Sequence, residues 1–217
     1  MSRAVRLYLL AYNSAQSIGW AIALTRIISS CLSSKSIHGA YAAAGDLICI
    51  LQTASFLEVL HAAVGIVPSG VLLSLMQWGG RTHFLLAIVR RIEEVQELPS
   101  VFITFVAWSI SEVIRYPHFA LTGLGFKPHW LIYLRYTAFI VLYPAGLGPG
   151  EMLLMYQSLP FIKEKALYSS FFAPFPFTYH TFVTVLLLSY PVMWLKLYLH
   201  LFKQRRAKLG RRRPKKD

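Results

Sequence analysis

Long apolar stretches alternate along the chain with short groups of charged and turn-forming residues. A helix that crosses the hydrocarbon core of a bilayer needs about 20 mostly apolar residues, so stretches of that length predict membrane spans. The interruptions delimit six of them, at residues 7–30, 41–64, 68–89, 98–122, 130–159 and 177–201. The pattern therefore predicts an all-α fold, a polytopic membrane bundle of six transmembrane helices. Gly65 and Pro68 are compatible with a tight turn or with a kink in one longer helix.

Composition supports this interpretation, because 56% of the residues are hydrophobic and only 14% are charged, which is unusual for a soluble domain. No internal repeat and no separate soluble domain interrupts the pattern. We therefore expect one membrane domain at residues 1–202, followed by a basic cytosolic tail at residues 203–217.

The net charge of +13 comes largely from the C-terminal stretch "KQRRAKLGRRRPKKD". No nucleic-acid-binding motif accompanies it, so we expect no nucleic-acid partner. Six spans place both termini on the same side of the membrane, and the positive-inside rule makes that side the cytosol. The cytosolic side then holds Arg3, Arg6, Lys127 and every basic residue from Lys203 onward. The opposite side holds only Lys35, Arg90, Arg91, Lys163 and Lys165.

Several ionisable side chains fall within the predicted spans, where each costs roughly 2.5 to 3.5 kcal/mol at the bilayer centre. Glu112 and Arg115 are one helical turn apart, as are Glu58 and His61. Such spacing favours pairing inside the bundle, and for these residues we expect structural pairing ahead of chemistry.

Several enzyme classes are excluded by their missing motifs. The stretch "LHAAVGIVPS" has the outline of a tyrosine-phosphatase loop, but Ala62 stands in place of the nucleophilic cysteine and Pro68 in place of the phosphate-binding arginine. The histidines are scattered rather than clustered, and no Gly-x-Ser-x-Gly sequence is present for a lipase. We therefore expect neither a metal site nor a cofactor.

The inactive phosphatase outline is followed by "WSISEVIRYPHF" from Trp108 and "LRYTAFIVLYPAGLGPGE" from Leu134. Together with "YNSAQSIGWA" near the N-terminus, these blocks resemble the very-long-chain (3R)-3-hydroxyacyl-CoA dehydratases, also called the protein-tyrosine-phosphatase-like family. The plant members look most similar, and the resemblance covers nearly the whole chain.

The resemblance implies a six-span enzyme of the endoplasmic reticulum membrane with both termini in the cytosol. It implies dehydration of 3-hydroxyacyl-CoA to trans-2-enoyl-CoA in fatty acid elongation, a hydro-lyase reaction that takes place within the lipid bilayer. Other elongase components would be partners, namely the condensing enzyme, the ketoreductase and the enoyl reductase. By motif match the catalytic pair is Tyr143 and Glu151.

One departure from the family pattern concerns the spacing of this pair, because the family glutamate usually follows the tyrosine by seven residues and here it follows by eight. In an unbroken α-helix, eight residues separate two side chains by about 12 Å along the axis and about 80° around it. Pro144, Gly146 and Pro149 favour a local break. We expect the backbone to leave helical geometry there and to bring Glu151 back toward Tyr143.

Dehydration needs a base at C2, an acid at the C3 hydroxyl and stabilisation of the thioester oxygen. We favour Tyr143 as the base that removes the C2 proton and Glu151 as the acid that protonates the leaving hydroxyl. The sequence leaves the reverse assignment open. Arg115 or Arg135 would support the phenol. We expect supporting or cavity-lining roles for Arg115, Arg135, Glu112 and Tyr136. Tyr136 should line the wall of the cavity rather than take part in catalysis.

Two other functions remain compatible with these features. A catalytically silent family member could act as a scaffold for the elongation enzymes, which the extra motif residue favours. A small transporter would also have polar groups and a broken span. The absence of an inverted repeat in the sequence argues against the transporter.

The six-span prediction is tested by tagging each terminus in sealed microsomes. Six spans place both ends on one side, which the positive-inside rule makes the cytosol, so both tags should be equally accessible to added protease. Protection of one tag alone would contradict the prediction.

Overall fold

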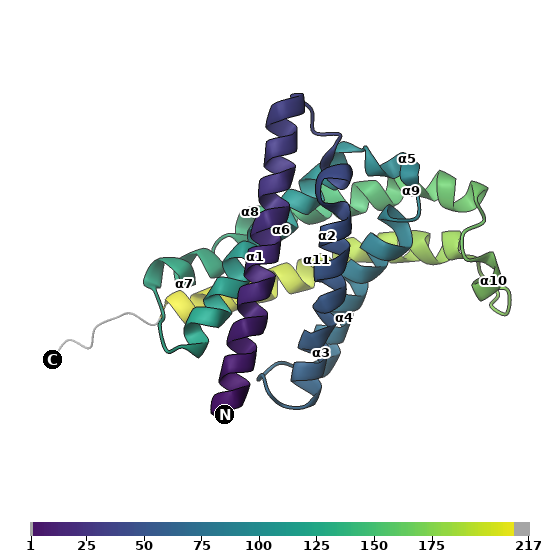
Figure 1. Cartoon of the computed structure of the whole chain (residues 1–217). Coiled ribbons are helices and arrows are strands. Elements are labelled where there is room, and N and C mark those ends of the chain that lie inside the picture. The colour runs from purple at the N-terminus through teal and green to yellow at the C-terminus, as the bar shows by residue number, and fades with distance from the viewer. Residues whose placement is uncertain (1, 211–217) are drawn as a thin grey trace.

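The structure is a computed structural model that describes residues 2–210, and it is all-α, as the sequence predicts. Part of the predicted basic tail, residues 211–217, lies outside the described residues. Figure 1 shows long helices that cross one another, with the N-terminus at the bottom of the view and the end of the last helix at its left, beside α7 (His129–Arg135).

The first half of the chain contains α1 (Arg3–Ser34), α2 (Ala40–Ala54), α3 (Phe56–Ala63), α4 (Val71–Thr82), a π-helix η1 (His83–Val89) and α5 (Glu93–Gln96). The second half contains α6 (Pro99–Gly123), α7 (His129–Arg135), α8 (Phe139–Ala145), a π-helix η2 (Gly146–Met152), α9 (Leu153–Glu164), α10 (Ser169–Phe172) and α11 (Tyr179–Leu209).

Each apolar stretch predicted from the sequence is helical over most of its length. The open question near Gly65 is resolved in favour of a turn: α3 ends at Ala63, Gly65 has a φ of 72°, and α4 starts at Val71. A positive φ is readily adopted by glycine, which lacks the Cβ that disfavours it in other residues.

Three helical segments among the described residues are both long and apolar enough to cross a membrane. They are Ala40–Ala63, His129–Glu164 and Tyr179–Leu209. The first combines α2 and α3, and the second runs from α7 through η2 to α9. These helices are typical of a multi-pass membrane protein.

Helix α6 forms the centre of the bundle, packing against α1, α2, α7, α8, η2 and α9. α1 packs against both α6 and α2, and it buries a stripe of residues at helical spacing that includes Gln16, Trp20, Ala23 and Ile27. α6 therefore faces protein on several sides, and any polar group that it carries at mid-length must find a protein partner.

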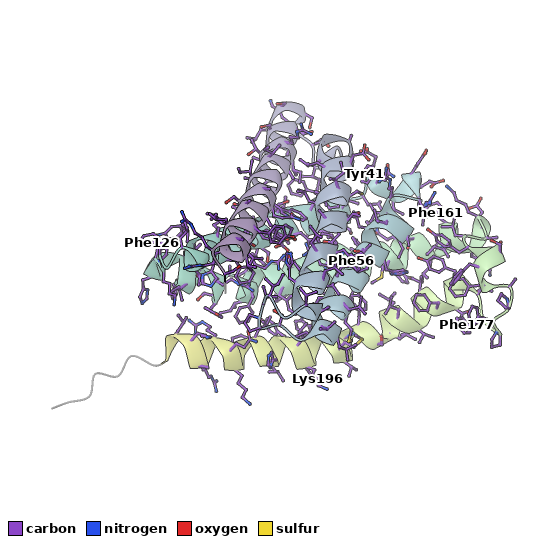
Figure 2. All side chains as sticks on the ribbon, turned by 60° about the horizontal axis from the view of Figure 1, so that its bottom comes forward. Tyr41, Phe56, Phe126, Phe161, Phe177 and Lys196 are labelled. Atoms are coloured by element: carbon purple, nitrogen blue, oxygen red, sulfur yellow. The ribbon has the colours of Figure 1, made fainter. Side chains whose placement is uncertain are left out.

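Helix α11 lies along the outside of the bundle and packs mainly against α9 (Figures 1 and 2). Much of its surface is exposed and apolar, including Leu188 and Val192. Lys196 projects from the same helix. A large exposed apolar surface on a long helix is suited to contact with lipid acyl chains.

The segment between Tyr143 and Glu151 remains helical, so the prediction that its backbone leaves helical geometry is wrong. Residues Gly146–Met152 form a π-helix, and Gly146 has φ −67° and ψ −38°. A π-helix bonds each N–H to the carbonyl five residues earlier, which makes each turn about one residue wider than in an α-helix. Pro144 and Pro149 lack the N–H groups that regular α-helical bonding would use.

The π-helical turn lies tightly against α6 at Gly150. A Cβ added to Gly150 would lie 2.5 Å from the Thr104 hydroxyl oxygen, whereas one added to Gly148 would have no neighbour within 4 Å. Thr104 is fully buried and donates to the Ser100 carbonyl, so it has little freedom to move. Gly150 therefore permits the close approach that holds η2 on α6.

The Gly150→Ala substitution should lower the stability of the purified protein by roughly 1–3 kcal/mol, the usual range for overpacking a buried contact. Gly148→Ala is the matched control, because it adds the same methyl group to the same turn in open space. Thermal unfolding in detergent should separate the two variants. Equal melting temperatures would contradict the packing described here.

Candidate active site

Tyr143 lies near the C-terminal end of α8 with its ring facing α11. The ring stacks on those of Trp194 and Tyr198, with centroids 6.5 Å and 6.0 Å away. The Tyr198 hydroxyl donates to the Ile140 carbonyl at 3.0 Å. This is the carbonyl that α-helical bonding would pair with the N–H at position 144, which Pro144 lacks. The proline thus leaves an acceptor on α8 that α11 satisfies.

Glu151 lies in η2 and is 9% exposed. The indole Nε1–H of Trp108, on α6, donates to Glu151 Oε1 at 2.8 Å. The side chain of Tyr190, on α11, lies near the same carboxyl group. Because a buried carboxyl needs polar partners, the Trp108 donor and the nearby Tyr190 hydroxyl explain how Glu151 is accommodated between α6 and α11.

Tyr143 and Glu151 both approach one face of α11. Their partners Tyr190, Trp194 and Tyr198 are spaced by four residues and so lie along a single stripe of that helix. The two side chains are close enough to interact electrostatically. A π-helical turn contains about one residue more than an α-helical turn. The eight residues from Tyr143 to Glu151 therefore complete about two turns, which is what seven residues complete in a regular α-helix.

A connected polar network extends from Glu151 into the bundle. The Arg81 guanidinium lies over the Trp108 ring, with its central carbon 4.1 Å from the centroid. Arg81 Nη1 contacts Glu112 Oε1 at 2.5 Å, while its Nε and Nη2 are buried and have no hydrogen-bond partner among the described residues. The charged groups are paired along the network, as buried charges in a membrane bundle must be.

The predicted pair of Glu112 and Arg115 is present, with Arg115 Nε 2.5 Å from Glu112 Oε2. Arg115 also forms a two-nitrogen contact with Glu58, at 2.6 Å and 2.9 Å. The expected partnership of Glu58 and His61 is replaced, because Glu58 binds Arg115 and the His61 ring bonds to the Tyr8 hydroxyl at 2.8 Å.

Neither arginine expected beside the phenol is among the described contacts of Tyr143. Arg115 is engaged by the two carboxylates, and Arg135 lies over the Phe119 ring, 5.8 Å from its centroid. Tyr136 packs edge-on against His118, with ring centroids 6.3 Å apart. The structure therefore brings Tyr143 and Glu151 to one face and leaves Arg135 and Tyr136 nearer the end of the bundle.

Three residues at this site were missed in the sequence analysis, namely Arg81, Trp108 and Tyr190. Arg81 was recognisable in principle, because it is a charged residue inside a predicted span. Trp108 and Tyr190 carry no such signal, since aromatic residues are common in membrane helices and only the fold shows which ones face a carboxyl group.

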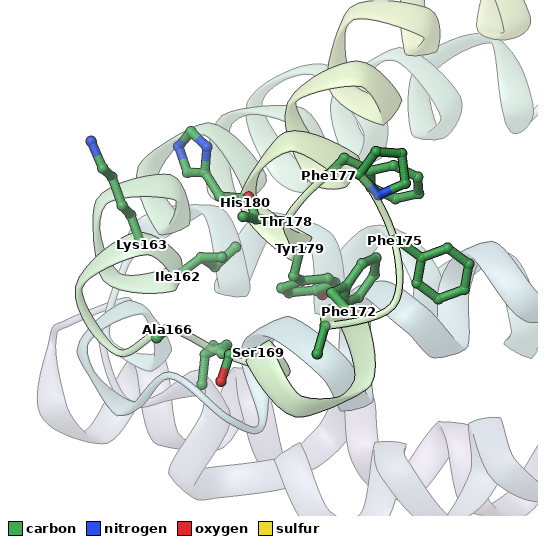
Figure 3. A pocket seen from close by; sticks show the side chains of 13 residues that line it. Ile162, Lys163, Ala166, Ser169, Phe172, Phe175, Phe177, Thr178, Tyr179 and His180 are labelled. Carbon is green, nitrogen blue, oxygen red and sulfur yellow. The ribbon is translucent and has the colours of Figure 1, made fainter.

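A separate open pocket of about 530 Å³ lies where the end of α9, α10 and the start of α11 meet (Figure 3). Aromatic side chains line it, including Phe172, Phe175 and Phe177, with Lys163 and His180 at its edge. It contains neither Tyr143 nor Glu151. Residues 2–210 contain no group of three histidine, cysteine, aspartate or glutamate side chains placed to hold a metal ion.

Outside the apolar spans, the Lys165 ammonium lies 2.8 Å from Glu94. This hydrogen bond and charge lower the pKa of the Glu94 carboxyl. Both side chains are exposed, so the pair connects α5 to the end of α9 with little effect on stability.

Comparison with known proteins gives consistent results. The model of the protein tyrosine phosphatase-like protein family, PTPLA, matches residues 52–211. The very-long-chain (3R)-3-hydroxyacyl-CoA dehydratase 2 of Mus musculus is 36% identical over 94% of this chain and 81% of its own length. The dehydratase PASTICCINO 2A of Oryza sativa subsp. japonica is 40% identical over 75% of this chain and 73% of its own length. No solved structure matches.

Replacing Trp108 with Phe should lower stability by roughly 1–3 kcal/mol through loss of the donor to Glu151, in addition to the effect of lost ring volume. The hydrogen-bond part is isolated by a double-mutant cycle with Glu151→Met, measured by thermal unfolding in detergent. Trp108→Phe should be less damaging in the Glu151→Met background. Additive effects would contradict the bond.

Proposed function

The chain belongs to the protein tyrosine phosphatase-like family, and on that premise we propose that it dehydrates very-long-chain (3R)-3-hydroxyacyl-CoA to trans-2-enoyl-CoA. The family members that it matches are named as 3-hydroxyacyl-CoA dehydratases, so the chain is an enzyme of the hydro-lyase class. The observation that carries the proposal is the approach of Tyr143 and buried Glu151 to one stripe of α11.

We assign Glu151 as the base that removes the C2 proton and Tyr143 as the acid that protonates the leaving hydroxyl. This assignment reverses the one favoured from the sequence. A neutral phenol can donate a proton at once, whereas it accepts one only after losing its own. The cation that would favour a phenolate is not among the described contacts of Tyr143, and the nearby Glu151 carboxylate disfavours a second negative charge.

With these roles, the reaction has three steps: removal of the C2 proton, loss of water, and return of a proton to Tyr143. The Glu151 carboxylate takes the C2 proton, and the C3–O bond breaks as the Tyr143 hydroxyl gives its proton to the departing oxygen, releasing water. Glu151 is left protonated and Tyr143 ionised. Tyr190 lies on the same stripe of α11, near both groups, and we propose that its hydroxyl relays a proton from Glu151 to Tyr143 to restore the starting state.

Arg81 supplies the third requirement, stabilisation of negative charge on the thioester oxygen. Its Nε and Nη2 are buried donors without a partner in the described structure, and the guanidinium lies over the Trp108 ring that bonds to Glu151. Donors held in place before the reaction are effective because they need little reorganisation as charge develops. Glu112 holds the guanidinium through Nη1.

We propose a six-span domain at residues 1–202 in the endoplasmic reticulum membrane, with both termini and the tail in the cytosol and with the other elongase components as partners. The 40% identity with the rice protein supports a plant-like member. The silent-scaffold alternative predicts no turnover by the purified chain, because its function would require no chemistry.

Tyr143→Phe and Glu151→Gln should each reduce kcat for dehydration by roughly 10² to 10⁴, because each removes one proton-transfer group while preserving side-chain size. The assay is the formation of enoyl-CoA from 3-hydroxyacyl-CoA by purified protein.

Matched controls are Tyr156→Phe and Glu164→Gln, since both residues are exposed on α9. Both controls should keep normal kcat. Near-normal turnover by Glu151→Gln would overturn the assignment of Glu151, and inactivity of the unsubstituted protein would favour the scaffold.

A further inference from the structure

Basic side chains from three helix ends meet at one end of the bundle. His118 lies in the last part of α6, Arg135 ends α7, and Arg205 and Lys208 belong to the last turns of α11. Figure 1 shows α7 beside the end of α11. We name these four residues the basic cluster.

Side-chain contacts join the three elements. The Arg135 guanidinium lies over Phe119 of α6, 5.8 Å from the ring centroid, and the His118 ring packs on Tyr136, the residue after Arg135. Arg205 Nε approaches the Thr137 hydroxyl at 3.5 Å. His118 is close enough to both Arg135 and Lys208 to interact electrostatically. Helices α6, α7 and α11 thus hold the cluster together.

The cluster carries an excess of positive charge. Among the described residues, no ion pair involves Arg135, Arg205 or Lys208, whereas Arg81, Arg90, Arg115 and Lys165 all contact carboxylates. Arg135 is only partly exposed, and the two carboxylates close enough to attract it, Glu58 and Glu112, are already bound by Arg115. Such a concentration of charge at a partly apolar surface is suited to a polyanion.

The position of the cluster matches the length of the proposed substrate. Arg135 precedes Tyr143 by eight residues, and the chain between them passes through a turn at residues 136–138 into α8, a separation of about 12 Å at the helical rise per residue. In CoA, the pantetheine arm separates the thioester from the phosphates by a span comparable to about four extended residues, or about 14 Å. A thioester at Tyr143 and Glu151 would therefore place the phosphates at the end of the bundle where the basic cluster lies.

We propose that the basic cluster binds the phosphate groups of the CoA portion of the substrate, an inference that rests on the proposed dehydratase function. Arginine suits this role because its planar guanidinium presents paired donors to phosphate oxygens. The phosphates of anionic lipid headgroups have the same chemistry, so the experiment must separate the two sources.

The test compares a 3-hydroxyacyl-CoA with the pantetheine thioester of the same acyl chain, which lacks the nucleotide phosphates. Arg205→Gln combined with Lys208→Gln alters only the end of α11, and Arg135→Gln is made separately. Each variant should raise KM for the CoA thioester by roughly tenfold or more, through loss of charge-assisted hydrogen bonds. KM for the pantetheine thioester and kcat for both substrates should stay unchanged.

Lys163→Gln is the matched control, because this exposed lysine lies at the end of α9, away from the cluster. It should leave both KM values unchanged. An equal KM increase for both thioesters, or an equal effect of Lys163→Gln, would overturn the proposal.

A binding measurement separates the phosphate sources and does not depend on turnover. Adenosine 3′,5′-bisphosphate should bind the unsubstituted protein in neutral-lipid nanodiscs and should bind the cluster variants at least about tenfold more weakly. If only association with phosphatidylserine vesicles responds to the substitutions, the cluster binds lipid and the proposal is wrong. If the unsubstituted protein dehydrates neither thioester, the proposed dehydratase function is wrong. The nucleotide-binding measurement still decides whether the basic cluster binds these phosphates.

Discussion

The burial of one carboxyl group, that of Glu151, is the constraint on which the rest of the site depends. A carboxyl group among apolar helices is unfavourable unless polar groups surround it. The Trp108 indole supplies a direct bond from α6, and Tyr190 approaches from α11. The same indole carries Arg81 on its face, and Arg81 in turn binds Glu112. Satisfying one buried group thus orders α6, η2 and α11 around a common polar centre.

The prolines of the motif have a second structural consequence. Pro144 removes a helical donor, and the carbonyl that this leaves at Ile140 accepts a bond from Tyr198. The ring of Tyr198 stacks beside Tyr143, so the defect in α8 also positions α11 against the proposed acid. The turn that follows is π-helical rather than broken, and Gly150 allows it to lie against Thr104. π-helical turns are frequent at functional sites because they shift side chains around the helix.

Apolar patterning was sufficient to predict an all-α fold and the approximate positions of its long helices, because apolar length is the dominant signal in a membrane protein. Pairing at helical spacing also identified Glu112 with Arg115, since both lie on one helix. The contact of Glu58 with Arg115 and the bond from Trp108 to Glu151 join residues far apart in the chain. Their prediction needed helix packing, which hydropathy does not contain. The π-helical turn was missed because glycine and proline suggest a break without specifying how the backbone adapts.

The wider turn of η2 absorbs the extra residue and so keeps Glu151 on the face of Tyr143. Deleting Gly148, which has no neighbour for a Cβ within 4 Å, restores the seven-residue spacing and should convert the π-helical turn to an α-helical one. The most direct measurement is kcat of this deletion variant for 3-hydroxyacyl-CoA dehydration, compared with that of a variant carrying one added alanine after Gly148. The deletion should keep kcat within about tenfold of the unsubstituted protein, whereas the insertion should rotate Glu151 by about 100° and abolish turnover. Loss of activity in a folded deletion variant, together with activity in the insertion variant, would contradict this role of η2.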